Sequence, residues 1–318
     1  MRRLFLLVAF FANLAVAQSY PDKPVRMVVG YSAGGPTDVI ARLIAQDMSA
    51  TLGQSVVVEN KTGANGLIGT LEVKRAPADG YTVLMTTLSH NVNAILMAEK
   101  KPYDPIADFA PVGLVCSLPL VLVTRGDSPA NSLADLINEA KAKPEQVSYA
   151  SAGNGGSAHL AAALLATLSK TRMTHVPFRG NAPALTEVMA GRVSFMFYPM
   201  VGISEQVAQK RLKALAVSTP QRHADYPGVP TMAEAGFPGF EEYTQGLGVV
   251  APRGTPPAVI ERLNAAVRAS LGKAETKTRL AALGAITQAS SPAEFTAWLK
   301  QDAERWARVI KAAGVKEE

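Results

Sequence analysis

The stretch from 25 to 48, VRMVVGYSAGGPTDVIARLIAQDM, contains the pattern G-x-S-x-G between Gly30 and Gly34. In α/β-hydrolases this pattern places a nucleophilic serine on the sharp turn between a strand and a helix, so Ser32 is a candidate nucleophile. That chemistry also needs an upstream strand and loop that supply part of the oxyanion hole. Ser32 follows the first expected strand, so this upstream loop is not expected. A histidine base is needed too, and none of the four histidines sits in an obvious late arrangement of an acid followed by a histidine: His90, His159, His175 and His223.

The same residues also fit an anion-binding loop. The first turn of a helix leaves backbone N–H groups without intrahelical partners, and the helix dipole adds positive charge there. Gly34 and Gly35 would let the backbone turn and a ligand approach closely. Pro36 suits the first helical position, which makes Gly35 the expected N-cap. Asp38 either only caps the first turn or also faces the ligand, and the sequence leaves both interpretations open.

The stretch from 147 to 160, VSYASAGNGGSAHL, repeats this arrangement. An apolar strand is followed by a small-residue loop with Ser151 and paired glycines, and then by a helix. We expect Ser157 to be the N-cap of that helix. His159 lies just inside the helix, where the positive helix end disfavours its protonation, so a neutral packed histidine is expected. Neither loop contains Lys or Arg, so backbone amides would bind the anion.

These loops belong to an alternation of strands and helices that predicts an α/β fold with parallel sheets. Expected strands include 25–30, 119–124 and 246–252, and an expected helix runs from Pro36 to a stop at Gly53. The last helix should begin at Ser291 with a capping box. Its apolar residues fall on one face and are expected to pack in the core: Phe295, Trp298, Leu299, Trp306, Val309 and Ile310.

Composition and targeting signals exclude several classes of protein. Residues 1–17 combine a basic start, a short apolar run and an A-x-A site, so they read as a cleaved signal peptide of an exported protein. A membrane anchor is the alternative, but the apolar run is too short to span a bilayer. The net charge is +6, and the basic residues are scattered along the 318 residues, which gives no support for nucleic-acid binding. Cys116 is expected to be a buried hydrophobe. No motif for a metal or a cofactor is present.

The order of several segments resembles the Bug, or TctC, family of periplasmic solute-binding proteins of tripartite tricarboxylate transporters. The segments are YPDKPVRMVVGYSAGGPTDVIAR, VVVENKTGANGLIGT, DGYTVLMTT, YASAGNGGSAHL, THVPFRGNAPALTEVMAGRV and VVAPRGTPP. The resemblance implies a type II periplasmic-binding-protein fold, with two α/β lobes joined by two crossing strands around a ligand cleft. Lobe one would be 18–121 plus 248–318, and lobe two would be 122–247.

The resemblance also implies a function and a set of binding residues. The protein would be a non-enzymatic carrier, expected as a monomer, that delivers a small carboxylate or dicarboxylate to membrane permease subunits. A sensor that presents its ligand to a signalling protein is an alternative. Arg179 either pairs with a distal carboxylate or is a solvated loop residue, and Tyr198 stands where the family often has an acidic residue. The implied ligand-binding residues are Tyr31, Ser32, Gly34, Gly35, Thr37, Asp38, Ser89, His90, Ser151, Asn154, Ser157, Arg179, Gly180 and Tyr198.

Overall fold

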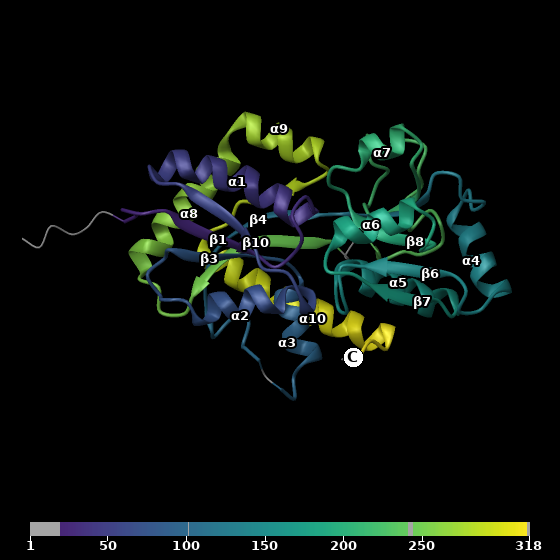
Figure 1. Cartoon of the computed structure of the whole chain (residues 1–318), viewed down its shortest axis with the longest axis horizontal. Coiled ribbons are helices and arrows are strands. Elements are labelled where there is room, and N and C mark those ends of the chain that lie inside the picture. Colours follow the sequence, from purple (N-terminus) through teal and green to yellow (C-terminus); the bar gives the residue numbers. More distant parts are fainter. Residues whose placement is uncertain (1–19, 101, 241–243, 317–318) are drawn as a thin grey trace, which may run out of the picture.

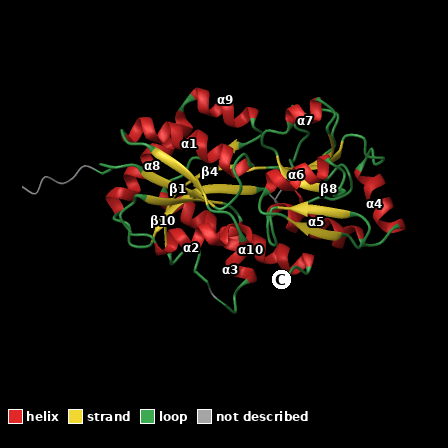
Figure 2. Cartoon of the chain, viewed as in Figure 1, coloured by secondary structure: helices red, strands yellow, loops and turns green. Residues whose placement is uncertain are grey.

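The computed structural model describes residues 20–100, 102–240 and 244–316 (Figure 1). The predicted signal peptide lies outside the described residues. Two separate β-sheets organise the chain, and helices cover both (Figure 2). The predicted α/β class is therefore confirmed. Among the described residues, no helix is long and apolar enough to cross a membrane.

The first sheet has six strands in the order β11-β4-β10-β3-β1-β2. β1 pairs in parallel with β2 and β3, whereas β10 runs antiparallel to β3 and β4. The strands are β1 (Val25–Val29), β2 (Val56–Asn60), β3 (Thr82–Thr86), β4 (Phe109–Leu118), β10 (Gln245–Pro252) and β11 (Ile286–Thr287).

The second sheet has five strands in the order β7-β6-β8-β5-β9. β6 pairs in parallel with β7 and β8, and β5 runs antiparallel to β8 and β9. The strands are β5 (Leu120–Arg125), β6 (Ser148–Ser151), β7 (Thr174–Pro177), β8 (Phe195–Pro199) and β9 (Leu212–Val217).

The chain crosses between the sheets twice. β4 ends at Leu118 and β5 begins at Leu120, so only Pro119 separates a strand of one sheet from a strand of the other. β10 brings the chain back into the first sheet from Gln245 onward. We call the first sheet with its helices lobe one and the second sheet with its helices lobe two. The lobe limits at 121 and 248 stay a prediction.

Helices pack on both faces of the first sheet. In β1, Met27 and Val29 belong to the apolar cluster that includes buried residues of α1 and α8, whereas Val28 belongs to a different cluster, with residues of α2 and α10. This alternation follows from the two-residue period of a strand. In the described residues, the helices, with one short 3₁₀ turn η1, are α1 (Pro36–Leu52), η1 (Ala64–Gly66), α2 (Leu67–Arg75), α3 (Ser89–Leu96), α4 (Leu133–Ala142), α5 (Ser157–Ser169), α6 (Asn181–Met189), α7 (Ser204–Ala208), α8 (Pro257–Gly272), α9 (Ala274–Ala282) and α10 (Pro292–Ala313).

Helix ends follow the sequence signals with one exception. α1 has Gly35 as N-cap and ends at Gly53 in the left-handed conformation, and α10 has the predicted capping box at Ser291. The apolar face of α10 is buried, except that Trp298 is half-buried. The N-cap predicted for α5 is wrong. Gly156, which is extended with a φ of −68° and a ψ of 161°, is the N-cap, and Ser157 is the first helical residue.

Candidate functional site

The two glycine loops lie at the carboxyl ends of parallel strands. Loop one (30–35) connects β1 to α1, and loop two (152–156) connects β6 to α5. Loop two touches lobe one through its glycines. A Cβ built on Gly153 would lie 3.4 Å from Asn65, and one on Gly155 would lie 2.7 Å from Leu96. The lobes are therefore closed on each other at these loops.

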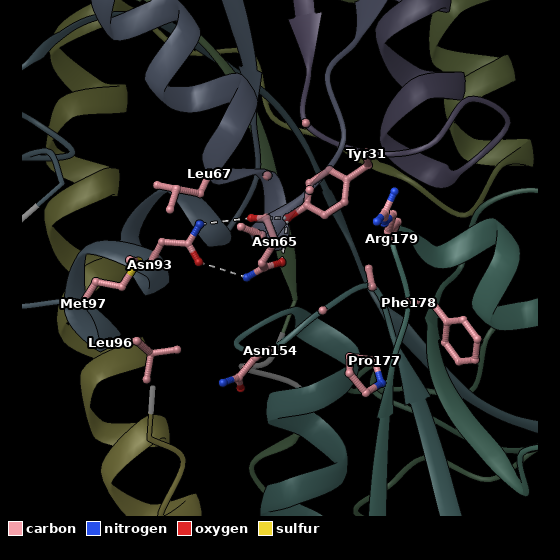
Figure 3. Close-up of a pocket in the computed structure, with 16 residues that line it drawn as sticks. Tyr31, Asn65, Leu67, Asn93, Leu96, Met97, Asn154, Pro177, Phe178 and Arg179 are labelled. Carbon is pink, nitrogen blue, oxygen red and sulfur yellow. Dashed lines mark hydrogen bonds between the residues drawn. The ribbon is translucent and has the colours of Figure 1, made fainter. Parts of the chain in front are cut away.

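A cavity of about 410 Å³ lies between the lobes (Figure 3). Lobe one lines it through loop one, the 63–67 segment and α3, and lobe two lines it through loop two and the end of β7. Of the residues predicted from the sequence, Tyr31, Asn154 and Arg179 line the cavity. Its lining residues are Gly30, Tyr31, Gly63, Ala64, Asn65, Gly66, Leu67, Asn93, Leu96, Met97, Ala152, Gly153, Asn154, Pro177, Phe178 and Arg179.

A much smaller space, which we call the helix-start void, adjoins this cavity and shares Tyr31, Asn65 and Ala152 with it. Its volume of about 10 Å³ is close to that needed by one water molecule. Thr37 and Ser157, both predicted from the sequence, line it. The complete lining is Tyr31, Thr37, Asn65, Thr87, Leu88, Ala152, Gly156, Ser157, Asn181 and Gln245.

Three helix N-termini converge on the void. Thr37, Ser157 and Asn181 belong to the first turns of α1, α5 and α6, and their N–H groups bond to no backbone carbonyl among the described residues. Each helix end carries partial positive charge. No Asp or Glu lines either the void or the cavity in the described part of the chain. The site is therefore suited to an anion and not to a cation.

Loop one touches lobe two directly. A Cβ on Gly35 would lie 4.0 Å from the backbone nitrogen of Ala182 at the start of α6. Gly180 has a φ of +151°, and a Cβ there would lie 2.2 Å from Ser32 Oγ, so only glycine fits. Gly180 thus allows the start of α6 to approach Ser32 of loop one.

Asp38 stabilises the conformation of loop one. Its carboxylate accepts hydrogen bonds from the Gly34 N–H, the Arg42 Nε and the Asn60 Nδ2, each at 2.9 Å. Burial alone would raise the pKa of Asp38, but these hydrogen bonds outweigh burial and lower it. Asp38 therefore supports loop one ahead of the N-cap, and no first-turn N–H of α1 is among its hydrogen-bond donors in the described residues, so both roles that the sequence left open stay predictions. Gly34 is exposed, and its amide is used by Asp38.

Ser32 lacks the partner that a nucleophile needs. Its Oγ is buried and has no hydrogen-bond partner among the described residues. The histidines are engaged elsewhere: His90 Nε2 lies 2.7 Å from the Pro105 carbonyl, and His159 Nδ1 accepts from the Gly155 N–H at 2.9 Å. The geometry around Ser32 therefore gives no support for hydrolysis.

Ser151 and two histidines support loop two on the side away from the cavity. Ser151 Oγ accepts from the Gly153 N–H at 3.1 Å and lies 2.7 Å from His175 Nε2. His175 stacks on His159 with ring centroids 3.9 Å apart. Burial, followed by the charge of His175, lowers the pKa of His159 to about 3. His159 is therefore neutral, as predicted. Ser151 is fully buried and lines neither the cavity nor the void.

The remaining predicted residues lie outside the cavity. Ser89 Oγ bonds Thr87 Oγ1 at 2.9 Å. His90 is 1% exposed, and burial lowers its pKa to about 4. Tyr198 lies in β8 within the apolar core of lobe two, where burial raises its pKa, and Cys116 is buried in lobe one as expected. No cluster of His, Cys, Asp and Glu in the described residues could hold a metal ion.

Asn65, which the sequence reading missed, organises the cavity wall. It adopts a left-handed conformation with φ of 50° and ψ of 44°. Its Oδ1 accepts from the Tyr31 hydroxyl at 3.0 Å, and its Nδ2 donates to Asn93 Oδ1 at 3.2 Å. Burial raises the pKa of Tyr31, which keeps that hydroxyl protonated. The glycine-rich segment KTGANGLIG was the available signal for this wall.

Comparison with known proteins gives the class and then the family. BugD, described as a periplasmic binding protein, is 36% identical, has a TM-score of 0.89, and covers 94% of this chain and 100% of its own. MatC from Rhodopseudomonas palustris, solved with bound malate, is 34% identical with a TM-score of 0.86 and coverages of 92% and 100%. Another R. palustris protein, solved with adipate, is 34% identical with a TM-score of 0.89 and coverages of 93% and 99%.

The fold is therefore that of a two-lobe periplasmic binding protein, as predicted. The model of the tripartite tricarboxylate transporter family receptor, TctC, matches residues 40–315. The chain belongs to this family. Its members are periplasmic solute-binding proteins and not enzymes.

Proposed function

We propose that this protein captures a small carboxylate between its lobes and delivers it to the permease of a tripartite tricarboxylate transporter. The observation that carries the proposal is the convergence of the first turns of α1, α5 and α6 on one void with no acidic side chain in its lining. Helix N-termini bind carboxylates through free N–H groups and the helix dipole. An anion there would also offset the mutual repulsion of the helix ends.

The ligand would place its carboxylate where the void meets the cavity and its body in the cavity. Tyr31 and Asn65 line both spaces, so they mark this junction. Arg179 is exposed and lines the cavity, where it can pair with an anionic group. Figure 3 places Arg179 on the opposite side of Asn65 from Leu96 and Met97. The end of the cavity nearer α3 therefore takes the apolar part of the ligand.

Relatives and sequence signals support the remaining parts of the proposal. Malate and adipate, bound in two related structures, are both dicarboxylates. The family name supports permease subunits as the partners. We further propose export with cleavage after Ala17, action as a monomer, and hinge closure of lobes divided at 121 and 248. Intact mass of the protein from the periplasm would test the cleavage.

Thermal unfolding with a matched ligand panel tests the proposed function. Malate, adipate and hexanoate would each be compared with the corresponding neutral amide. A ligand at a hundredfold excess over its Kd stabilises the folded state by about 2.7 kcal/mol, which gives a shift of a few degrees for a chain of this size. We expect shifts with one or more acids and none with the amides. Equal shifts with the amides, or no shift with any acid, would contradict the proposal.

A further inference from the structure

Gln245 connects the two lobes at the helix-start void. It is the first residue of β10, is 4% exposed, and lines the void. Its Oε1 accepts a hydrogen bond from Ser157 Oγ of α5 at 2.9 Å. Its Nε2 lies 3.5 Å from Thr37 Oγ1 of α1, a long contact. One carboxamide thus joins a hydroxyl of lobe two to a hydroxyl of lobe one.

The direction of these bonds decides which hydroxyl can donate to a ligand. A hydroxyl has one hydrogen to donate. Ser157 uses its hydrogen on Gln245 Oε1. Thr37 instead accepts from Gln245 Nε2, so its own hydrogen is left for another acceptor. Thr37 is 3% exposed and lines the void, and that acceptor would be the anionic group of a ligand whose carboxylate lies at the junction of the void and the cavity.

We infer that Gln245 is a positioning residue for ligand capture: anchored by Ser157, it orients the Thr37 hydroxyl as a donor to the anion. The inference rests on the proposed function. The inference gives the first turns of α1 and α5 different roles. Thr37 of α1 would contact the anion directly, whereas Ser157 of α5 would act on the anion only through Gln245. Lobe opening would separate Ser157 from Thr37, so this alignment exists in the closed form.

A double-mutant cycle tests the inference. Affinities for malate and adipate would be measured by titration calorimetry for Gln245→Met, Thr37→Val, the double variant and Ser157→Ala. Gln288→Met is the matched control, because Gln288 is a half-buried glutamine that lines neither space. Because hydrogen bonds to charged groups are stronger than those between neutral groups, Thr37→Val should weaken ligand binding at least tenfold. Gln245→Met should weaken it about tenfold.

Coupling between the two residues is the decisive result. We expect the double variant to bind about as well as Thr37→Val alone, because Gln245 acts through Thr37. Ser157→Ala should cost less than Thr37→Val, and the control should leave affinity unchanged. Additive losses, or a larger loss from Ser157→Ala than from Thr37→Val, would overturn the inference. Parent protein that binds neither probe contradicts the proposed function, and this inference with it.

Two further measurements distinguish a role of Gln245 in ligand capture from a role in the stability of the fold. One is the thermal midpoint of the protein without ligand, and the other is the ligand affinity of a second variant. Gln245→Met should keep the thermal midpoint of the parent without ligand; a drop that matches the loss of affinity would refute a role in capture. Gln245→Glu would let both hydroxyls donate to the new carboxylate and would place a negative charge at the helix starts. It should weaken anion binding more than Gln245→Met, and weaker or equal loss would refute the proposed alignment.

Discussion

Replacing Gly35 by aspartate would place a negative charge at the point where α1 approaches α6. Gly35 has a φ of −78° and a ψ of 167°, which any residue can adopt. A Cβ there would lie 3.2 Å from the Ser32 carbonyl oxygen and 4.0 Å from the Ala182 nitrogen, so the side chain fits after a small local shift. Aspartate is also a good N-cap, and the stability of the fold should change by only a few tenths of a kcal/mol.

Binding should change far more than stability. Two like charges about 4 Å apart repel by about 4 kcal/mol at the effective dielectric constant of such sites. Since each 1.4 kcal/mol is about tenfold, the aspartate variant should bind a carboxylate roughly a thousandfold more weakly. Gly35→Asn is the matched control, because it adds the same volume without the charge.

Titration calorimetry of both variants with malate and adipate separates charge from crowding. We expect the asparagine variant to lose much less affinity than the aspartate variant, and both to unfold near the temperature of the parent. Equal affinities of the two variants would refute the argument that the helix starts bind an anion.

Three further predictions concern the loops behind the site. Ser151→Ala should lower the free energy of unfolding by about 1–2 kcal/mol in urea titrations, since the Gly153 N–H loses its acceptor; an unchanged midpoint would argue against this. The pKa of Asp38 is lowered, so its carboxylate stabilises the fold above about pH 4 and loses that effect in more acidic solution. Unfolding midpoints of the parent and of Asp38→Asn should differ at neutral pH and converge as the pH falls below about 4. A difference that stays constant with pH would contradict a stabilising role of the Asp38 carboxylate. Burial lowers the pKa of His159 to about 3, so the unfolded chain takes up a proton first once the pH falls below about 6.5, and the fold loses stability. Midpoints of His159→Gln should fall less than those of the parent between pH 7 and 5, and equal slopes would count against this.

Local patterns were sufficient to predict the elements that carry the site. The strand, glycine loop and helix around Gly35 follow from residue types within one short segment, and so does the capping box at Ser291. The start of α5 was misplaced by one residue because both Gly156 and Ser157 are acceptable N-caps, and the observed backbone uses the glycine. Such ambiguity is common at helix ends.

Contacts between segments that lie far apart in the chain could not be predicted from local sequence patterns. Asn65 depends on Tyr31, on Asn93 and on the glycines of loop two, none of which is its neighbour in sequence. Gln245 contacts Ser157 of α5 and Thr37 of α1, and both lie far from it in the sequence. Ser151 resembles Ser32 in its local pattern, yet its hydroxyl is bonded to a histidine from the next strand.

A crystal structure with a bromine-labelled carboxylate would test the central claim most directly, because anomalous scattering locates the bromine and thereby orients the ligand. The label would be 2-bromoadipate or bromosuccinate, whichever stabilises the protein more. We predict a carboxylate within hydrogen-bond distance of first-turn N–H groups of α1 and of α5 or α6, with Thr37 Oγ1 as a donor. A ligand whose carboxylates all lie toward Leu96 and Met97, away from the helix starts, would contradict the account.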